Sequence, residues 1–132
     1  MNISKQVVIL SAENSTNTFE GNRQRTTTLE GMLEDIGLPF ERATGVYKGQ
    51  REASFVVIVR DETDIDILKG FAFNNFNQEA VLLQDSNQEA HLIFRNGSSE
   101  RLGRLEQVSE EIAMSQDSFT LLNDSYYITV PR

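Results

Sequence analysis

The sequence contains no cysteine, and His91 is its single histidine among 132 residues. The absence of cysteine excludes disulfides, thiol nucleophiles and zinc sites with thiolate ligands. One histidine also excludes a metal site built from several histidines. Basic residues are few, because 12 lysines and arginines stand against 20 acidic residues, giving a formal net charge of -8. This balance argues against nucleic acid as a partner, since nucleic-acid binding needs a basic surface.

Long apolar runs and common nucleotide or nucleophile motifs are also missing. The opening apolar run, residues 7–10, is too short for a signal peptide or a membrane span. The sequence has no P-loop, no G-x-G-x-x-G after the first predicted strand and no G-x-S-x-G elbow. We therefore expect a soluble, intracellular protein with no membrane partner. The length predicts one domain, residues 1–132, that buries a real core.

Hydrophobic periodicity predicts alternating strands and helices. A helix is expected at 23–36, because Leu29, Met32, Leu33 and Ile36 fall on one face and Gly37 can end it. A second helix starts at 61–64 and ends near residues 74–75. Strands are expected at 6–11, 42–47, 54–60, 80–83 and 90–94, with a polar loop reaching about residue 22 and a turn at 48–51.

The tail has weaker patterning, with a strand expected at 101–108 and a hairpin formed by 119–122 and 126–130. Residues 109–117 fit a short helix or a loop equally well. The order of elements predicts an α+β fold, with a ferredoxin-like antiparallel sheet, two helices on one face and additional C-terminal β-strands. The other face of the sheet would need a partner or the tail to cover it.

One segment, residues 45–55, has side chains suited to binding a cation. Tyr47 and Glu52 lie on either side of a tight turn, with the glutamate at the start of the apolar central strand. A partly desolvated carboxylate there can hold a ligand ammonium, and a tyrosine ring can pack against a ring or a cation. Spacing alone favours an ordinary hairpin with a solvated glutamate.

Other polar segments also follow or precede core strands. Gln78 and Glu79 precede a predicted strand, although exposed residues at a helix exit would look the same. The loop at 11–17 follows the first strand directly. Arg23 and Arg25 suit a carboxylate or phosphate ligand as well as they suit a solvated helix start. A lone histidine within a strand, such as His91, is more often structural than catalytic.

These segments together resemble the small bacteriophage enzymes that degrade S-adenosylmethionine, once called hydrolases and now described as lyases. The resemblance covers about residues 6–95 and rests on an ordered set of segments, namely VILSA at 8–12, NS at 14–15, RQR at 23–25, GVY at 45–47, Glu52 and QEAVL at 78–82. The stretch between Tyr47 and Glu52 is shorter than in the family, and the tail beyond about residue 95 shows no match.

The resemblance implies a homotrimer whose sites lie between subunits, in a host bacterial cytoplasm. It implies cleavage of S-adenosylmethionine into methylthioadenosine and homoserine lactone, with Tyr47 and Glu52 as the catalytic pair. It also implies a substrate-binding set made of Ser11, Ala12, Glu13, Asn14, Gln78 and Glu79. No cofactor or metal is expected, because the substrate carboxylate can attack the carbon next to a sulfonium leaving group.

Two other classes of function remain open from the residues. A phage protein with the same pocket could sequester a nucleotide-derived signalling ligand without turnover. An acidic structural or inhibitory protein could instead bind a basic partner, and that binding would weaken with salt. The anti-restriction role that the resemblance implies, depletion of the host's methyl donor, applies to the lyase alone.

Overall fold

A computed structural model describes residues 5–131 of the chain. The strands are β1 (Val7–Ser11), β2 (Phe40–Tyr47), β3 (Gln50–Ile58), β4 (Ala80–Gln84), β5 (Ala90–Phe94), β6 (Ser99–Val108), β7 (Phe119–Leu122) and β8 (Ser125–Val130). The helices are α1 (Phe19–Ile36), α2 (Glu62–Gly70), which continues into a π-helical turn η1 (Phe71–Asn75), and α3 (Glu110–Met114).

All eight strands form one closed antiparallel barrel in the order β1-β3-β2-β7-β8-β6-β5-β4. The predicted ferredoxin-like fold, an open sheet with extra strands at its end, is therefore wrong. The tail strands do not lie over a face of the sheet. They join it instead, because β5 pairs with β4, β7 pairs with β2, and β6 and β8 link these two ends. Closure gives every strand of the described residues a neighbour on both sides along at least part of its length.

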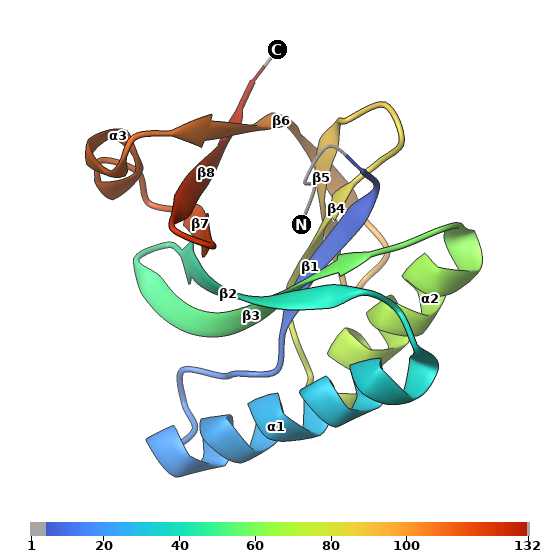
Figure 1. Ribbon diagram of the computed structural model, residues 1–132. Helices are drawn as coiled ribbons and strands as arrows, with labels where there is room; N and C mark the ends of the chain where they lie inside the picture. Colours follow the sequence, from blue (N-terminus) through green and yellow to red (C-terminus); the bar gives the residue numbers. More distant parts are fainter. Residues whose placement is uncertain (1–4, 132) are drawn as a thin grey trace.

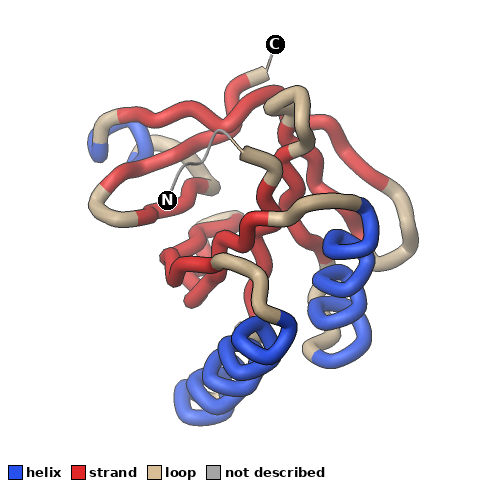
Figure 2. Tube along the Cα trace, turned by 45° about the vertical axis from the view of Figure 1, so that its right-hand side comes forward, coloured by secondary structure: helices blue, strands red, loops and turns tan. Residues whose placement is uncertain are grey.

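The helices α1 and α2 lie on the same side of the barrel, and α3 lies apart from them beside β8 (Figures 1 and 2). The main core fills the space between these two helices and the outer face of the barrel. It includes the fully buried side chains Leu29, Leu33, Phe55, Val57 and Leu68. Within the described residues, no helix is long and apolar enough to cross a membrane.

A second apolar cluster lies inside the barrel, because successive residues of a strand point to opposite faces. On β3, Phe55 and Val57 contact the helices, whereas Val56 between them packs with Val7, Ile9 and Leu122. This two-sided burial explains why the central strands appear in the sequence as continuous apolar runs rather than as alternating ones.

Helix α1 begins four residues before its predicted start. The Thr18 hydroxyl accepts a hydrogen bond from the Gly21 N–H at 3.0 Å and so caps the helix, while the apolar pattern becomes visible only later. The predicted end is confirmed, since Gly37 adopts a left-handed conformation with φ 74°. Between β2 and β3 the turn is only Lys48–Gly49, both with positive φ, and β3 starts at Gln50, earlier than predicted.

The β6–β8 pairing gives a direct test of the barrel wall. At Gly103, with φ +98°, an added Cβ would lie 2.0 Å from the Val130 carbonyl oxygen, whereas at Gly97, with φ +89°, it would meet nothing within 4 Å. We expect Gly97→Ala to lower the free energy of unfolding by about 1 to 2 kcal/mol through its backbone conformation alone. Gly103→Ala should lower it by roughly 3 kcal/mol or more, because β8 must also move. Urea unfolding measures both, and equal losses would contradict the pairing.

Candidate functional site

A cavity of about 530 Å³ opens where β1 ends beside the longer strand β3. The pairing of β1 with β3 stops at Ser11 and Ser54, while β3 itself begins at Gln50. Residues 50–53 therefore pair with β2 on one side only. Five parts of the chain line the cavity, namely the segment after β1, α1, β2, β3 and the β7–β8 hairpin. The lining residues are Glu13, Thr26, Arg42, Ala43, Thr44, Arg51, Glu52, Ala53, Ser54, Phe55, Leu121, Asn123 and Asp124.

The hydroxyl of Ser11 organises the point where the two strands part. It donates a hydrogen bond to the Ala53 carbonyl at 2.8 Å and accepts one from the Glu13 N–H at 3.0 Å. These two bonds replace the strand pairing that ends there. Glu13 lies two residues beyond the last β1 pair and Glu52 two residues before Ser54 on β3, and both line the cavity, so the backbone brings two carboxylates to the same place.

The Glu52 carboxyl is the strongly perturbed acid of the cavity. Burial, and to a smaller extent the nearby Glu13 carboxylate, together raise its pKa from the ordinary 4.5 to about 7. Gly45 is paired with Glu52 on the neighbouring strand. A Cβ at Gly45 would lie 2.7 Å from the Ser54 hydroxyl, so a larger residue there would require that hydroxyl to move.

Two arginines line the same cavity, but only one is already paired. Arg42 forms a two-pronged pair with Glu30, at 2.8 Å from Nε and 2.6 Å from Nη2. Within the described residues, the Arg51 guanidinium has no ion pair or hydrogen bond. The cavity thus combines an acidic pair with one cation that is available to a ligand, which suits a small zwitterionic molecule.

Three of the residues predicted for substrate binding or catalysis come together here, namely Ser11, Glu13 and Glu52. Ala12 is buried, and its carbonyl accepts a hydrogen bond from Arg25 Nε at 2.6 Å. The Asn14 N–H donates to the Asn22 side chain at 2.9 Å. Ala12 and Asn14 therefore shape the loop without lining the cavity, and their roles in binding stay predictions.

The remaining predicted residues lie outside the cavity of this chain. Gln78 donates from Nε2 to the Glu13 carbonyl at 2.8 Å, so it contacts the site through the backbone. Glu79 has an exposed side chain, and its carbonyl accepts from the Arg95 N–H at 3.1 Å. Tyr47 lies at the tip of the β2–β3 hairpin, where its ring centre is 5.2 Å from Lys48 Nζ. Neither Tyr47 nor Glu79 lines the cavity.

Sequence patterns missed several residues of the site. Thr26 is buried on α1 and lies 3.5 Å from the Glu13 carboxylate, and it carries no local signal of function. Arg51 lies in segment 45–55, where the sequence pattern singled out Tyr47 and Glu52 and not this arginine. Asn123 and Asp124 form the predicted turn before the last strand, both with positive φ. They reach the cavity only because the barrel closes.

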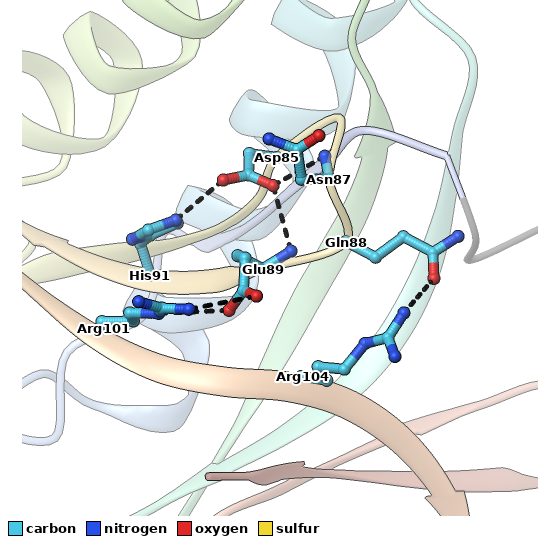
Figure 3. Close-up of polar contacts among 7 residues, drawn as sticks. All are labelled: Asp85, Asn87, Gln88, Glu89, His91, Arg101 and Arg104. Atoms are coloured by element: carbon cyan, nitrogen blue, oxygen red, sulfur yellow. Dashed lines mark hydrogen bonds and ion pairs between the residues drawn. The ribbon is translucent and has the colours of Figure 1, made fainter. Parts of the chain in front are cut away.

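A second polar cluster surrounds His91 at the β4–β5 turn (Figure 3). One oxygen of Asp85 lies 2.9 Å from His91 Nε2, and the other accepts from the N–H groups of Asn87 and Glu89. Glu89 in turn pairs with Arg101. Asp85 thus ties the turn to the strand that follows it, and the cluster is explained by the hairpin that it stabilises.

The chain also matches a known protein family. The S-Adenosylmethionine lyase family matches residues 8–130, and the chain belongs to that family. It is an enzyme of the lyase class whose substrate is S-adenosylmethionine, a small molecule. The match includes the tail, so the expectation that resemblance ends near residue 95 is wrong. Among curated proteins, none matches the chain.

The raised pKa of Glu52 makes a prediction about stability. Between pH 4.5 and about 7 the folded chain holds a proton that the unfolded chain has released, so this group lowers stability as pH rises. Glu52→Gln should unfold like the wild type near pH 4.5 and be more stable by roughly 2 kcal/mol at pH 8. Urea unfolding across this pH range measures the difference. A constant difference at all pH values would show that Glu52 titrates normally.

Proposed function

We propose that this cavity cleaves S-adenosylmethionine into methylthioadenosine and homoserine lactone. The observation that carries the proposal is the partly buried Glu52 beside Glu13 in an open cavity, within a chain of the lyase family. Two carboxylates in such a place are unfavourable by themselves and become favourable when a cation binds between them. The substrate carries two positive groups, a sulfonium and an ammonium.

The reaction needs no group beyond the substrate itself. A carboxylate oxygen of the substrate attacks its own γ-carbon, and the carbon–sulfur bond breaks with its electron pair moving to sulfur. The products are a neutral thioether and a lactone that keeps the ammonium, so no proton has to move. The enzyme accelerates this step by holding the chain of the substrate in the folded, reactive shape.

Charge changes during the step decide which substrate group the acids should hold. The sulfonium charge disappears as the bond breaks, so a carboxylate against it would favour the ground state over the transition state. The ammonium keeps its charge throughout. We therefore assign Glu52, with Glu13, to the ammonium, where their contact anchors the substrate without opposing the reaction.

Arg51 suits the substrate carboxylate, because it lines the cavity and is unpaired within the described residues. A guanidinium that contacts the oxygen which does not attack would orient the carboxylate toward the γ-carbon. Its contact is present in the ground state and weakens as the carboxylate becomes a lactone. Arg51 should therefore contribute mainly to substrate binding.

We also propose that the active assembly is a homotrimer with sites between subunits. Two of the predicted residues, Tyr47 and Glu79, lie outside the cavity of their own chain. A neighbouring copy could bring them to it, with the tyrosine ring against the adenine or the sulfonium. Light scattering of the purified protein tests this, and a strict monomer at micromolar concentration with full activity would contradict it.

The biological setting in the proposal is a phage infection. An enzyme that consumes S-adenosylmethionine in the host bacterial cytoplasm would deprive restriction and modification systems of their methyl donor. The proposal therefore expects infection of a restricting host to depend on turnover, so an inactive but folded variant would give no protection.

The first test is product analysis. We expect purified protein incubated with S-adenosylmethionine to yield methylthioadenosine and homoserine lactone, detected by chromatography with mass detection. Glu52→Gln should lower kcat/KM by roughly 100-fold or more, because an anchoring charge is lost. Glu34→Gln, the same change at an exposed position of α1, is the matched control. Intact substrate recovered from folded wild-type protein would support a binding-only protein and contradict the lyase.

The second test concerns Arg51. We expect Arg51→Gln to raise KM by roughly 10-fold and to leave kcat the same or slightly higher, because the contact with the substrate carboxylate is stronger in the ground state than in the transition state. Arg23→Gln removes the same charge from an exposed arginine outside the cavity and should leave both constants unchanged. A KM that is the same in the two variants would show that the substrate carboxylate binds elsewhere.

A further inference from the structure

Two side chains from separate elements converge on the main chain that carries Glu13. The first is Arg25 of α1. Its Nε donates to the Ala12 carbonyl at 2.6 Å, and its Nη2 donates to the Phe76 carbonyl. The guanidinium carbon also lies 5.4 Å from the centre of the Phe76 ring. One arginine thus joins the exit of β1 to the end of the second helical segment.

The second side chain is Gln78, which reaches the same place from the other side. Its Nε2 donates to the Glu13 carbonyl at 2.8 Å and lies 3.3 Å from the Phe76 carbonyl. The Phe76 carbonyl is therefore shared by Arg25 and Gln78. Together the two residues engage the carbonyls of Ala12 and Glu13, the two residues that directly follow β1.

Gln78 owes its position to an unusual end of the helix. The helix finishes in the π-helical turn η1, which Phe76 N–H closes by donating to Phe71 O at 3.2 Å. Asn77 then adopts a left-handed conformation with φ 54°, and the Gln78 N–H donates to the Ala72 carbonyl at 2.9 Å. Turns of the π type occur often at functional sites, where they redirect a side chain.

We propose that Arg25 and Gln78 are positioning residues that hold the Ala12–Glu13 main chain so that the Glu13 carboxylate faces Glu52 in the cavity. The proposal rests on the proposed function for its relevance to catalysis, but its geometry does not. Beyond Glu13 the loop is mostly exposed and is held chiefly by Asn14 and Asn22, which bond each other. Without the two contacts, Glu13 would be held only by the Ser11 hydroxyl at its N–H and by the Thr26 hydroxyl, 3.5 Å from its carboxylate, among the described residues.

The readout that separates positioning from simple stabilisation is the titration of Glu52. The charged groups that line the cavity with Glu52 are Glu13, Arg42, Arg51 and Asp124. Of these, the Glu13 carboxylate is the one whose charge raises the pKa of Glu52, after burial. If Glu13 moves away from Glu52, the pH at which Glu52 is half-ionised must fall, because like charges repel less at a greater separation.

The experiment is an NMR titration of the Glu52 side chain in protein with ¹³C-labelled glutamate, compared among four proteins. Glu13→Gln sets the benchmark, with a midpoint expected to fall by roughly half a pH unit or more. Gln78→Ala should lower the midpoint in the same direction by at least half as much. The double variant should show no further fall beyond Glu13→Gln, because both changes act through one charge.

A matched control is available at the other end of β1. Gln84 also donates from its side-chain amide to a main-chain carbonyl, that of Lys5, at 2.6 Å. Gln84→Ala should leave the Glu52 midpoint unchanged. If Gln78→Ala does not fold, Arg25→Lys answers the same question, because it keeps the charge and removes the two-pronged contact.

An unchanged Glu52 midpoint in folded Gln78→Ala or Arg25→Lys would overturn the proposal, as would fully additive shifts in the double variant. The titration uses neither substrate nor turnover. A wild-type protein that fails to cleave S-adenosylmethionine would therefore refute the proposed function and leave this inference standing. If the wild type cleaves S-adenosylmethionine but the Glu52 midpoint is unchanged in the variants, the proposed function would stand and the positioning role of Arg25 and Gln78 would be refuted.

Discussion

The site depends on the place where β1 stops pairing with β3. A strand without its neighbour leaves main-chain donors and acceptors open to water. Here the Ser11 hydroxyl satisfies the Ala53 carbonyl and the Glu13 N–H, so the chain can leave the sheet without losing those bonds. The chain beyond Ser11 then brings Glu13 to the cavity that Glu52 also lines, close enough for its charge to act on the Glu52 carboxyl. Burial of the Glu52 carboxyl and, after it, repulsion from the Glu13 carboxylate together raise the pKa of Glu52 to about 7.

The rest of the fold supports this unfavourable pair. Fully buried side chains such as Leu29, Leu33 and Phe55 pack α1 against the barrel, and each contributes roughly 1.5 to 3 kcal/mol through burial. This packing also fixes Arg25 and Thr26, which contact the chain around Glu13. Binding of a cation removes the repulsion between the acids. The site is therefore preorganised for a positive ligand. The repulsion between the two acids is offset by core packing when the protein folds, and not by the binding energy of the substrate.

The sequence predicted local structure better than assembly. The spacing of Leu29 and Leu33 placed the end of α1 correctly, and the hairpin at Asn123 was foreseen, because such signals depend on neighbouring residues. The ferredoxin-like arrangement was wrong, since barrel closure depends on long-range pairings that leave no local pattern. The residues alone singled out Glu52 and the loop that holds Glu13, the resemblance supplied their roles as a prediction, and the structure brings the two side chains to one cavity. Thr26 and Asp124 could not be foreseen, because helix packing and barrel closure bring them to the cavity.

The central claim is that the acid pair receives the ammonium of the substrate. The most direct measurement is the titration of Glu52 by NMR, in the free protein and with saturating S-adenosylhomocysteine, which keeps the ammonium and the carboxylate but lacks the sulfonium charge. The account predicts a midpoint near pH 7 in the free protein and a clear fall when the ligand binds, because a neighbouring cation favours the ionised carboxylate. A midpoint that stays the same or rises in the complex would contradict the claim.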